Sequence, residues 1–249
     1  MPQLRTVRCL DDNYAYLIHE AGQTVLVDAP EAGPILNELN DAGWSLDVIL
    51  LTHHHDDHIQ AVPAIVEATG AQVWGNGADA RRLPPLDRAL SVGEVVDLLD
   101  DRVDVLDAPG HTIGHVAFNF ERSKMLFTAD SLMALGCGRL FEGDADTMWN
   151  TLDRLAALPG DTLVCSGHDY CRSNGAFALS VDPDNQALRQ RLSDNAAGKR
   201  PCSPATLSDE IATNPFLRAA ALADSLGMTD QPANKVFAQL RKMKDSFRG

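Results

Sequence analysis

Four histidines and two aspartates fall within seven residues of the chain, in the stretch Thr-His-His-His-Asp-Asp-His at 52–58. The stretch follows the apolar run 48–51, which predicts a buried strand that ends where the histidines begin. Imidazole and carboxylate groups at this density are typical of a transition-metal site. The alternative is a polar turn with coincidental histidines, and the interleaved aspartates argue against it. The chain is therefore predicted to fold around a metal site at the end of a strand.

Three later motifs supply the same residue types, and each follows a predicted strand. His111 and His115 belong to the first of them, Asp130 to the second and His168 to the third. Together with the first stretch, these motifs hold seven of the eight histidines and leave only His19 elsewhere. The pattern places the potential ligands at one edge of the predicted sheets, where α/β folds commonly bind ligands.

The spacing inside the first stretch divides it between two metals. Alternate residues of an extended chain share one side, and the last two residues of the stretch occupy the turn that follows. The predicted ligands are His53, His55 and His111 for one metal, Asp57, His58 and His168 for the other, and Asp130 as a bridge between them. Each metal then keeps an open position for water, as a catalytic centre requires.

Four neighbouring polar residues are given other roles. His54 is expected to be a spacer that points away from the metals, and Asp56 to be part of the turn or to support a ligand. His115 is expected to orient a ligand or its loop rather than to bind a metal. Asp28 is expected either to partner a histidine ligand or to hold a turn.

The predicted secondary structure changes near residue 170, from mainly strands to helices. Before that point, short apolar runs between turn residues predict ten strands, at 4–7, 14–18, 24–27, 48–51, 72–74, 95–98, 103–106, 116–120, 125–128 and 162–166. Helical spacing predicts helices at 34–42, 61–68 and 147–158 in the same part, and at 185–195, 215–226 and 232–247 after it. Two domains are therefore expected, at 1–172 and 173–249.

The charge of the chain limits its partners. The formal net charge is −14, which argues against nonspecific binding of nucleic acid. Residues 1–170 carry 10 Lys and Arg against 27 Asp and Glu, whereas residues 171–249 carry 11 against 8. Bound divalent cations would offset part of the acidic excess, and the basic end could attract an anionic substrate. Ordinary solvated faces are the alternative.

Cysteine usage and hydropathy predict where the protein works. The five cysteines are scattered without a Cys-x-x-Cys pair, which predicts neither a disulfide framework nor a zinc ribbon. A reducing cytoplasm is therefore expected. No apolar run is long enough to cross a membrane, and the N-terminus lacks the apolar region of a signal peptide. A monomer is expected rather than an obligate oligomer.

The ligand motifs resemble those of a known superfamily. The pattern His53-x-His55-x-Asp57-His58, followed in order by His111, Asp130 and His168, resembles the dinuclear hydrolases of the metallo-β-lactamase superfamily. The resemblance implies an α/β fold in which two mixed sheets pack between helices as a four-layer αββα sandwich, with the metal site at one edge. A C-terminal helical domain would follow the sandwich.

Stretches along nearly the whole chain are similar to glyoxalase II, the hydroxyacylglutathione hydrolases. They lie at 12–16, 136–143, 167–170, 214–218 and 241–247. The resemblance implies hydrolysis of the thioester of S-D-lactoylglutathione and similar S-(2-hydroxyacyl)glutathiones to glutathione and a 2-hydroxy acid, a step of methylglyoxal detoxification. A hydroxide bridging two divalent metals would be the nucleophile, with Asp57 and Asp130 as the catalytic carboxylates. Zinc is the favoured metal, and iron or manganese also suits the ligands.

The resemblance also implies a site for glutathione. Its contacts would be Arg139, Phe141, His168, Tyr170, Arg241 and Lys244. Phe141 stands where some relatives have tyrosine, so one hydroxyl contact to the tripeptide is absent. The pair Arg241 and Lys244 would hold the glycine carboxylate. The alternatives are a surface salt bridge for Arg139 and a solvated helix face for the pair.

Three other functions compete with this interpretation. A lactonase or a different thioesterase of the superfamily would share the metal ligands but would not need the basic pair near the C-terminus. A mononuclear iron persulfide dioxygenase is expected to lack a complete second set of ligands, whereas Asp57, His58 and His168 are all present. A metal-binding scaffold without activity is least favoured, because no ligand position is degraded.

Overall fold

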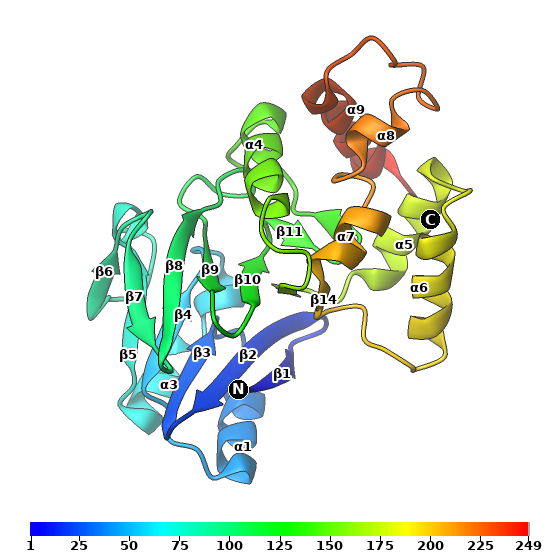
Figure 1. The fold of residues 1–249 in the computed structure, drawn as a ribbon. Helices are drawn as coiled ribbons and strands as arrows, with labels where there is room; N and C mark the ends of the chain where they lie inside the picture. The colour runs from blue at the N-terminus through cyan, green and yellow to red at the C-terminus, as the bar shows by residue number, and fades with distance from the viewer. Residues whose placement is uncertain (249) are drawn as a thin grey trace. The chain divides into compact units, whose positions relative to one another are not determined.

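The computed structural model describes residues 1–248 and divides the chain into two compact units. Unit 1 comprises residues 1–107 and 114–129, and unit 2 comprises residues 108–113 together with the chain from 130 onward. Figure 1 colours the chain from blue at the N-terminus to red at the C-terminus. The two domains expected from the sequence, at 1–172 and 173–249, divide the chain differently and stay a prediction.

Unit 1 contains a six-stranded mixed sheet with the strands in sequence order. The strands are β1 (Gln3–Cys9), β2 (Asn13–Glu20), β3 (Gln23–Val27), β4 (Val48–Leu51), β5 (Gln72–Asn76) and β6 (Arg88–Leu90). β1, β2 and β3 pair in antiparallel fashion, and β3 to β6 are parallel. Parallel neighbours need a crossover, and the helices α1 (Ala32–Ala42) and α3 (Val62–Thr69) supply it on either side of β4.

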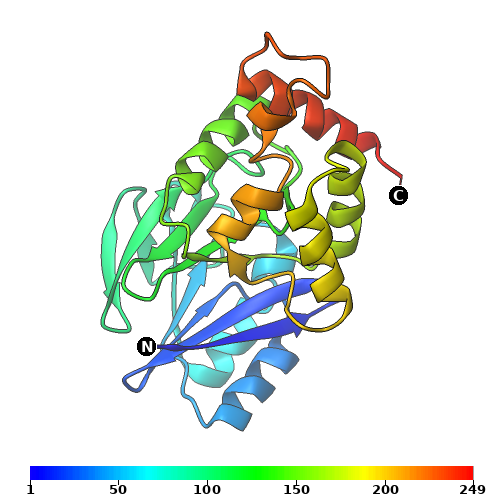
Figure 2. The same cartoon turned by 45° about the vertical axis from the view of Figure 1, so that its right-hand side comes forward.

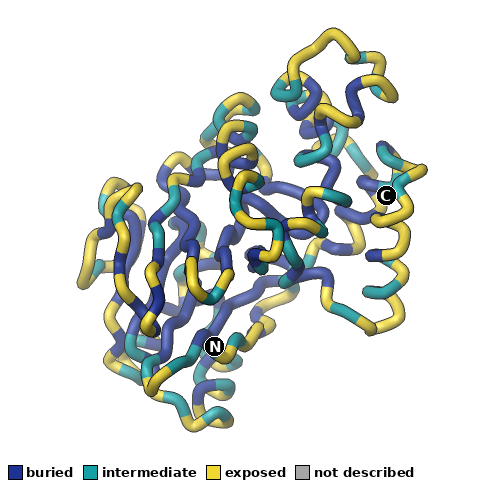
Figure 3. The backbone as a smooth tube through the Cα atoms, in the orientation of Figure 1, coloured by how far each residue is buried: buried dark blue, intermediate teal, exposed yellow. Residues whose placement is uncertain are grey.

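The second sheet of unit 1 is a run of antiparallel neighbours, coloured green in Figure 1. Its strands are β7 (Val95–Leu98), β8 (Asp101–Asp107), β9 (Val116–Phe120) and β10 (Met125–Ala129). β9 and β10 are buried along their whole length, as Figure 3 shows in dark blue. Strands buried on both faces are expected in the middle of a layered fold.

The residues of β2 explain how the layers of unit 1 pack. Ala15 and Leu17 join the apolar cluster that contains Ile35 of α1 and Ile65 of α3. Tyr16 points to the opposite face, because side chains alternate along a strand, and its ring lies 5.5 Å from that of Phe127 in β10. Helices, first sheet and second sheet therefore form three successive layers within unit 1.

Unit 2 is mainly helical. Its helices are α4 (Ala145–Ala156), α5 (Cys171–Val181), α6 (Gln186–Ala196), α7 (Leu207–Thr213), α8 (Ala219–Leu222) and α9 (Ala233–Ser246). Its strands are β11 (Leu132–Met133) and β12 (Gly136–Cys137), which form a hairpin, and β13 (Leu163–Ser166), which pairs with β14 (Ala205–Thr206). α5 and α6 run side by side in Figure 2. The ring of Phe216 stacks on that of Phe177 and meets that of Phe237 edge to face, which joins α5 to α9.

All ten predicted strands are present, and most predicted helices are too. The helix expected at 215–226 is wrong in length, since only α8 is helical there. Asn214 explains the difference: its side chain accepts the backbone N–H of Phe216 and fixes a turn before the helix can begin. The expectation that strands end by residue 170 is wrong at β14, and α5 and α7 were not predicted.

The cysteines correct another expectation. Cys171 and Cys202 form a disulfide, with their Cα atoms 5.9 Å apart. No spacing motif marks the pair because α5, α6 and the loop after α6 bring the two residues together across 31 positions of sequence. Cys9, Cys137 and Cys165 remain buried thiols. Burial raises the pKa of Cys9 to about 12 and raises the pKa of Cys165 further, which keeps both thiols unreactive.

No helix of residues 1–248 is long and apolar enough to cross a membrane.

Candidate metal centre and substrate site

Unit 1 presents the first histidine stretch beyond the carboxyl end of β4. The chain stays extended through His55, and the one-turn helix α2 (Asp56–Ile59) then carries Asp57 and His58. His53 and His58 are buried, whereas His55 and Asp57 are partly exposed. The backbone N–H of Val116, where β9 begins, donates to the carbonyl of Thr52 and fixes the start of the stretch.

Asp28, directly after β3, holds two residues of the stretch. Its Oδ1 accepts the backbone N–H of Thr52 at 2.9 Å, and its Oδ2 accepts the Thr52 hydroxyl and His58 Nδ1, each at 2.8 Å. A proton on Nδ1 leaves the Nε2 lone pair of His58 available to a metal. Asp28 takes up a left-handed backbone, with φ of 59°, to reach both partners. The expectation that Asp28 partners a histidine is confirmed.

His53 and His55 turn nitrogen atoms toward each other. Thr52 Oγ1 lies 3.0 Å from His53 Nδ1, and because that hydroxyl already donates to Asp28, it accepts from the imidazole. The lone pair of His53 is therefore on Nε2, which lies 3.2 Å from His55 Nδ1. Two nitrogen ligands of tetrahedral zinc are separated by about 3.3 Å, so the pair fits such an ion.

Asp57 is oriented by a residue that sequence reasoning did not assign to the site. Asn13 Nδ2 donates to the backbone carbonyl of Asp57 at 2.9 Å and to its Oδ2 at 3.1 Å. That oxygen is also 3.9 Å from His58 Nε2, which places the two predicted ligands of the second metal side by side. Asn13 is buried and belongs to the stretch 12–16 that resembles the hydrolase family.

Unit 2 presents the other predicted ligands around one carboxylate oxygen. Oδ2 of Asp130 lies 3.3 Å from His111 Nε2 and 3.4 Å from His168 Nε2, and all three side chains are buried. His111 Nδ1 donates to the carbonyl of Arg139 at 2.8 Å, so the lone pair of His111 is on Nε2. One carboxylate oxygen shared between two histidines is the arrangement that a bridging ligand needs.

Gly138 allows this arrangement. A Cβ at Gly138 would lie 2.0 Å from the carbonyl oxygen of Asp130 and 2.8 Å from His111 Nδ1, so no other residue fits there without displacing a ligand. The predicted ligands thus form two groups, four side chains in unit 1 and three in unit 2. Their division between two metals stays a prediction.

Two histidines given other roles have clear contacts. His115 stacks on His53, with ring centroids 4.7 Å apart and planes 17° from parallel, which supports a role in orienting that ligand. His54 Nδ1 lies 3.3 Å from Asp79 Oδ2. His54 therefore lies beside a carboxylate of its own, and its role as a spacer between ligands stays a prediction.

Arg241 is buried, contrary to the alternative of a solvated helix face. It is 5% exposed, and its Nη1 donates to the carbonyl of Cys137 at 2.9 Å. Its Nη2 donates to Asp245 at 2.7 Å, and the guanidinium lies over the ring of Phe216. Burial acts to lower the pKa of Arg241, but its interactions with the Cys137 side chain and with the charge and hydrogen bond of Asp245 raise it overall. Arg241 therefore carries a permanent positive charge inside unit 2.

Lys244 lies one helical turn after Arg241. Its Nζ donates to the carbonyl of Ser173 at 3.1 Å and sits 5.7 Å from the ring centroids of Phe177 and Phe247. Burial lowers the pKa of Lys244, and the positive charges of Arg241 and Arg139 lower it further. The three basic residues therefore act on one another electrostatically and would favour an anionic ligand.

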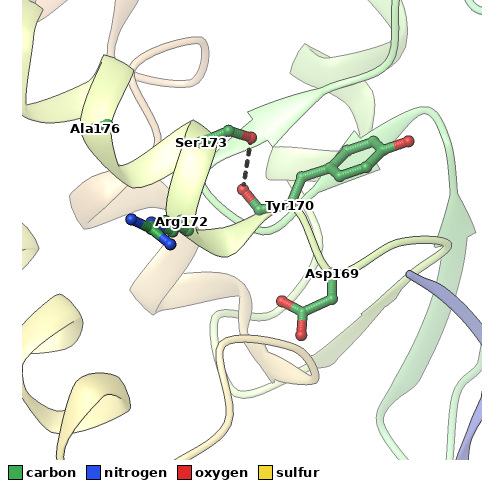
Figure 4. A pocket seen from close by; sticks show the side chains of 5 residues that line it. All are labelled: Asp169, Tyr170, Arg172, Ser173 and Ala176. Carbon is green, nitrogen blue, oxygen red and sulfur yellow. Dashed lines mark hydrogen bonds between the residues drawn. The ribbon is translucent and has the colours of Figure 1, made fainter. Parts of the chain in front are cut away.

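The two predicted aromatic contacts flank the histidines of unit 2. The ring of Tyr170 stacks on His168, with centroids 4.8 Å apart and planes 5° from parallel. Phe141 is 63% exposed and meets His111 edge to face at 5.3 Å. Tyr170 also lines a pocket of about 370 Å³ with Asp169, Arg172, Ser173 and Ala176, shown in Figure 4.

Similarity to known proteins covers nearly the whole chain. Residues 10–168 match the model of the metallo-beta-lactamase superfamily, and residues 169–247 match the model of the hydroxyacylglutathione hydrolase C-terminus. The chain is 56% identical over 252 residues to hydroxyacylglutathione hydrolase of Ruegeria pomeroyi and 54% identical over 252 residues to that of Cereibacter sphaeroides. Each alignment covers 98% of this chain and 99% of the relative.

A solved structure of the same fold is similar to this chain. The crystal structure of TTHA1623 in a di-iron-bound form is 28% identical to this chain, with a TM-score of 0.64. The match covers 86% of this chain and 100% of that one.

Fold and ligand groups together define a metal-dependent hydrolase of the metallo-β-lactamase superfamily. Within that class, the chain belongs to the hydroxyacylglutathione hydrolase, or glyoxalase II, family. The family inferred from the sequence is confirmed, and so are the α/β sandwich and the C-terminal helical domain.

Proposed function

We propose that the chain hydrolyses the thioester of S-(2-hydroxyacyl)glutathiones such as S-D-lactoylglutathione, and so takes part in methylglyoxal detoxification. The products are glutathione and a 2-hydroxy acid, here D-lactate. Identity above 50% to hydroxyacylglutathione hydrolases along the whole chain supports this substrate class. The observation that carries the reaction type is the single oxygen of Asp130 that lies against both His111 and His168.

The proposed centre takes two divalent cations. His53, His55 and His111 would hold one, Asp57, His58 and His168 the other, and Asp130 both. Imidazole and carboxylate donors of this kind suit zinc, which is the metal to test first, and also iron or manganese. When bound, the cations supply hydroxide near neutral pH and offset negative charge that develops on the substrate carbonyl oxygen.

Residues around the proposed ligands determine which atom of each ligand is available to a metal. Asp28 keeps the proton of His58 on Nδ1, and Thr52 does the same for His53. Asn13 donates to Oδ2 of Asp57 and so fixes the orientation of that carboxylate. These contacts exist before substrate arrives, so orientation costs little at the reaction step.

The basic and aromatic side chains of unit 2 would bind the glutathione part of the substrate. Arg139, Arg241 and Lys244 favour its carboxylates, and Phe141, His168 and Tyr170 would contact the tripeptide and thioester. Binding the distant end of the substrate positions the carbonyl for attack. A thiol with pKa of about 8.5 leaves as an anion, so no side chain is required as a general acid.

We further propose that residues 173–249 form the substrate-binding domain and that the protein works as a monomer in the cytoplasm. The cytoplasm holds a glutathione pool, which is the product thiol of the proposed reaction. Disulfides are uncommon in that compartment, so the state of Cys171 and Cys202 in cell extracts tests the proposed location.

Metal analysis combined with an activity assay tests the proposed function. Purified protein should contain about two metal ions per chain, the number set by the proposed ligand sets. It should release one thiol for each S-D-lactoylglutathione consumed, without taking up oxygen. About one metal per chain with oxygen uptake would instead indicate an iron dioxygenase. Hydrolysis of lactones but not of the thioester would indicate another hydrolase of the superfamily.

A further inference from the structure

We infer that Asp79 is a positioning residue for the His53 and His55 pair, acting through His54 and Gly114. The inference rests on the proposed metal role of that pair. Asp79 follows β5 and was not singled out by any sequence motif. It is one of few carboxylates of unit 1 that are almost fully buried, at 6% exposed.

The topology of unit 1 brings Asp79 to the histidine stretch. β4 and β5 are parallel neighbours, with Leu51 opposite Gly75, so both strands end at the same edge of the sheet. The chain then turns in the short helix η1 (Gly77–Asp79), where Asn76 Oδ1 accepts the N–H of Ala78. This turn places Asp79 beside the middle residue of the stretch.

The carboxylate of Asp79 has a basic neighbour at each of its oxygens. Arg82 Nε donates to Oδ1 at 2.6 Å, and Oδ2 lies 3.3 Å from His54 Nδ1. Arg82 Nη1 in turn lies 3.4 Å from His54 Nε2. Since a guanidinium only donates, His54 Nε2 is the acceptor of the Arg82 bond. Arg82 and Asp79 therefore flank the imidazole of His54, Arg82 by a hydrogen bond and Asp79 by proximity.

A second contact ties Asp79 to the other segment beside the ligands. A Cβ at Gly114 would lie 2.4 Å from Asp79 Cγ, so the carboxylate packs directly on the glycine backbone. Asn76 Nδ2 donates to the carbonyl of Gly114 at 2.9 Å. The next residue, His115, stacks on His53. Asp79 thus supports His53 and His55 from two sides, through the residue between them and through the residue that precedes the stacking ring.

This placement has a consequence for metal binding. The 3.2 Å separation of His53 Nε2 and His55 Nδ1 depends on the backbone on either side of His54. If His54 rotates, both nitrogens move relative to each other. Asp57 and His58 are held separately, by Asn13 and Asp28, so losing Asp79 should affect one metal and spare the other. Removing a residue that orients metal ligands typically weakens metal affinity by about 10- to 100-fold.

Metal release from the loaded enzyme tests the inference. Zinc-loaded protein is mixed with an excess of a chromogenic chelator, and the two release phases are resolved in time. The phase that belongs to the His53 and His55 metal is the one missing from His55→Ala. Asp79→Asn, which keeps the size of the side chain, should accelerate that phase about 10- to 100-fold and leave the other at the wild-type rate.

Asp87→Asn is the matched control. Asp87 lies directly before β6 and beside β5, accepts the N–H of Val73 at 2.8 Å and lies on the surface, so its substitution removes an equal charge without touching the histidines. Its release phases should equal those of wild type. Circular dichroism of each variant establishes that it is folded.

Three results overturn the inference, and they are distinguishable. Wild-type release of both metals from Asp79→Asn would show that the residue does not position the pair. Equal acceleration of both metals, or an equal effect of Asp87→Asn, would show a general loosening or a charge effect. Wild-type protein that binds none of zinc, iron and manganese would refute the proposed function itself, and the inference with it.

Discussion

Breaking the disulfide between Cys171 and Cys202 should destabilise the folded chain by an amount that the loop length predicts. The two cysteines are 31 residues apart in the sequence, so the bond closes a long loop that contains α6. In the chain-entropy model, closing a loop of this length restricts the unfolded chain by about 3.7 kcal/mol at 25 °C. Reduction should therefore lower the free energy of unfolding by about 3 to 4 kcal/mol.

The position of the bond indicates where the loss would be felt. Cys171 directly follows Tyr170 and begins α5. Cys202 precedes Ser203, whose hydroxyl accepts the hydroxyl of Ser166 at 2.8 Å at the end of β13. The disulfide therefore braces both sides of the turn that carries His168. Reduction is expected to loosen this turn before unit 2 as a whole unfolds.

Urea unfolding followed by circular dichroism, with and without a phosphine reductant, measures the effect. Thiol titration of denatured protein should count three thiols before reduction and five after it. The control is the double variant Cys171→Ala, Cys202→Ala, which lacks the bond, so the reductant should leave its free energy of unfolding unchanged. The reasoning is refuted if the thiol count rises from three to five in wild type while its unfolding curve stays the same.

Further expectations concern the metal ligands, the basic pair and the buried ion pair of unit 2. Asp130→Ala should lose bound metal and turnover together in metal analysis and in the thioester assay, and full metal content would contradict the bridging role. Lys244→Met should raise KM and leave kcat unchanged. The difference in KM between this variant and wild type should shrink as pH rises through the lowered pKa of Lys244, because the ammonium group then loses its charge. Because the pKa of Lys244 is lower in the folded chain, the unfolded chain binds more protons at this residue. The contribution of Lys244 to the free energy of unfolding should therefore increase as pH rises between the two pKa values. Arg241→Ala should raise KM, and an unchanged KM would show that Arg241 is not part of the substrate site. The same variant should lower the free energy of unfolding in urea by about 1 to 3 kcal/mol, because the carbonyl of Cys137 loses its hydrogen-bond donor. Glu210→Ala should cost about 3 to 5 kcal/mol, since it leaves the buried guanidinium of Arg191 without its carboxylate, and a loss below about 1 kcal/mol would contradict this.

The sequence predicted the strands well because their signal is local. In β4, four consecutive apolar residues with turn signals at both ends suffice, and the strand is buried as expected. β6 and β14 were missed because they are two or three residues long and exist through pairing with distant segments. The helix expected at 215–226 failed for a related reason, since the side chain of Asn214 competes with the helix for a backbone N–H.

The candidate site divides in the same way. The ligand types could be predicted because imidazoles and carboxylates are rare enough to stand out when they cluster. The residues that orient them were harder to predict, because Asn13 and Asp28 reach Asp57 and His58 across 44 and 30 positions of sequence. Asn13 was not assigned to the site, and Asp28 was expected to partner a histidine without any indication of which one. The pair Arg191 and Glu210 was missed for that reason too. Supporting contacts of this kind depend on topology rather than on local pattern.

Asp28 shows how the structure separates a supporting carboxylate from a ligand. Asp28, His53 and His58 lie close enough to hold an ion, and composition alone cannot exclude that arrangement. The oxygens of Asp28, however, already accept three hydrogen bonds, from Thr52 and His58, and the donor atom of His58 is its Nδ1. A metal bound between Asp28 and His58 Nδ1 would have to displace these donors and move the proton of His58 to Nε2, which would remove the lone pair that Nε2 offers beside Asp57. The hydrogen bonds that Asp28 accepts from Thr52 and His58 therefore favour a role in supporting His58 over a role as a metal ligand.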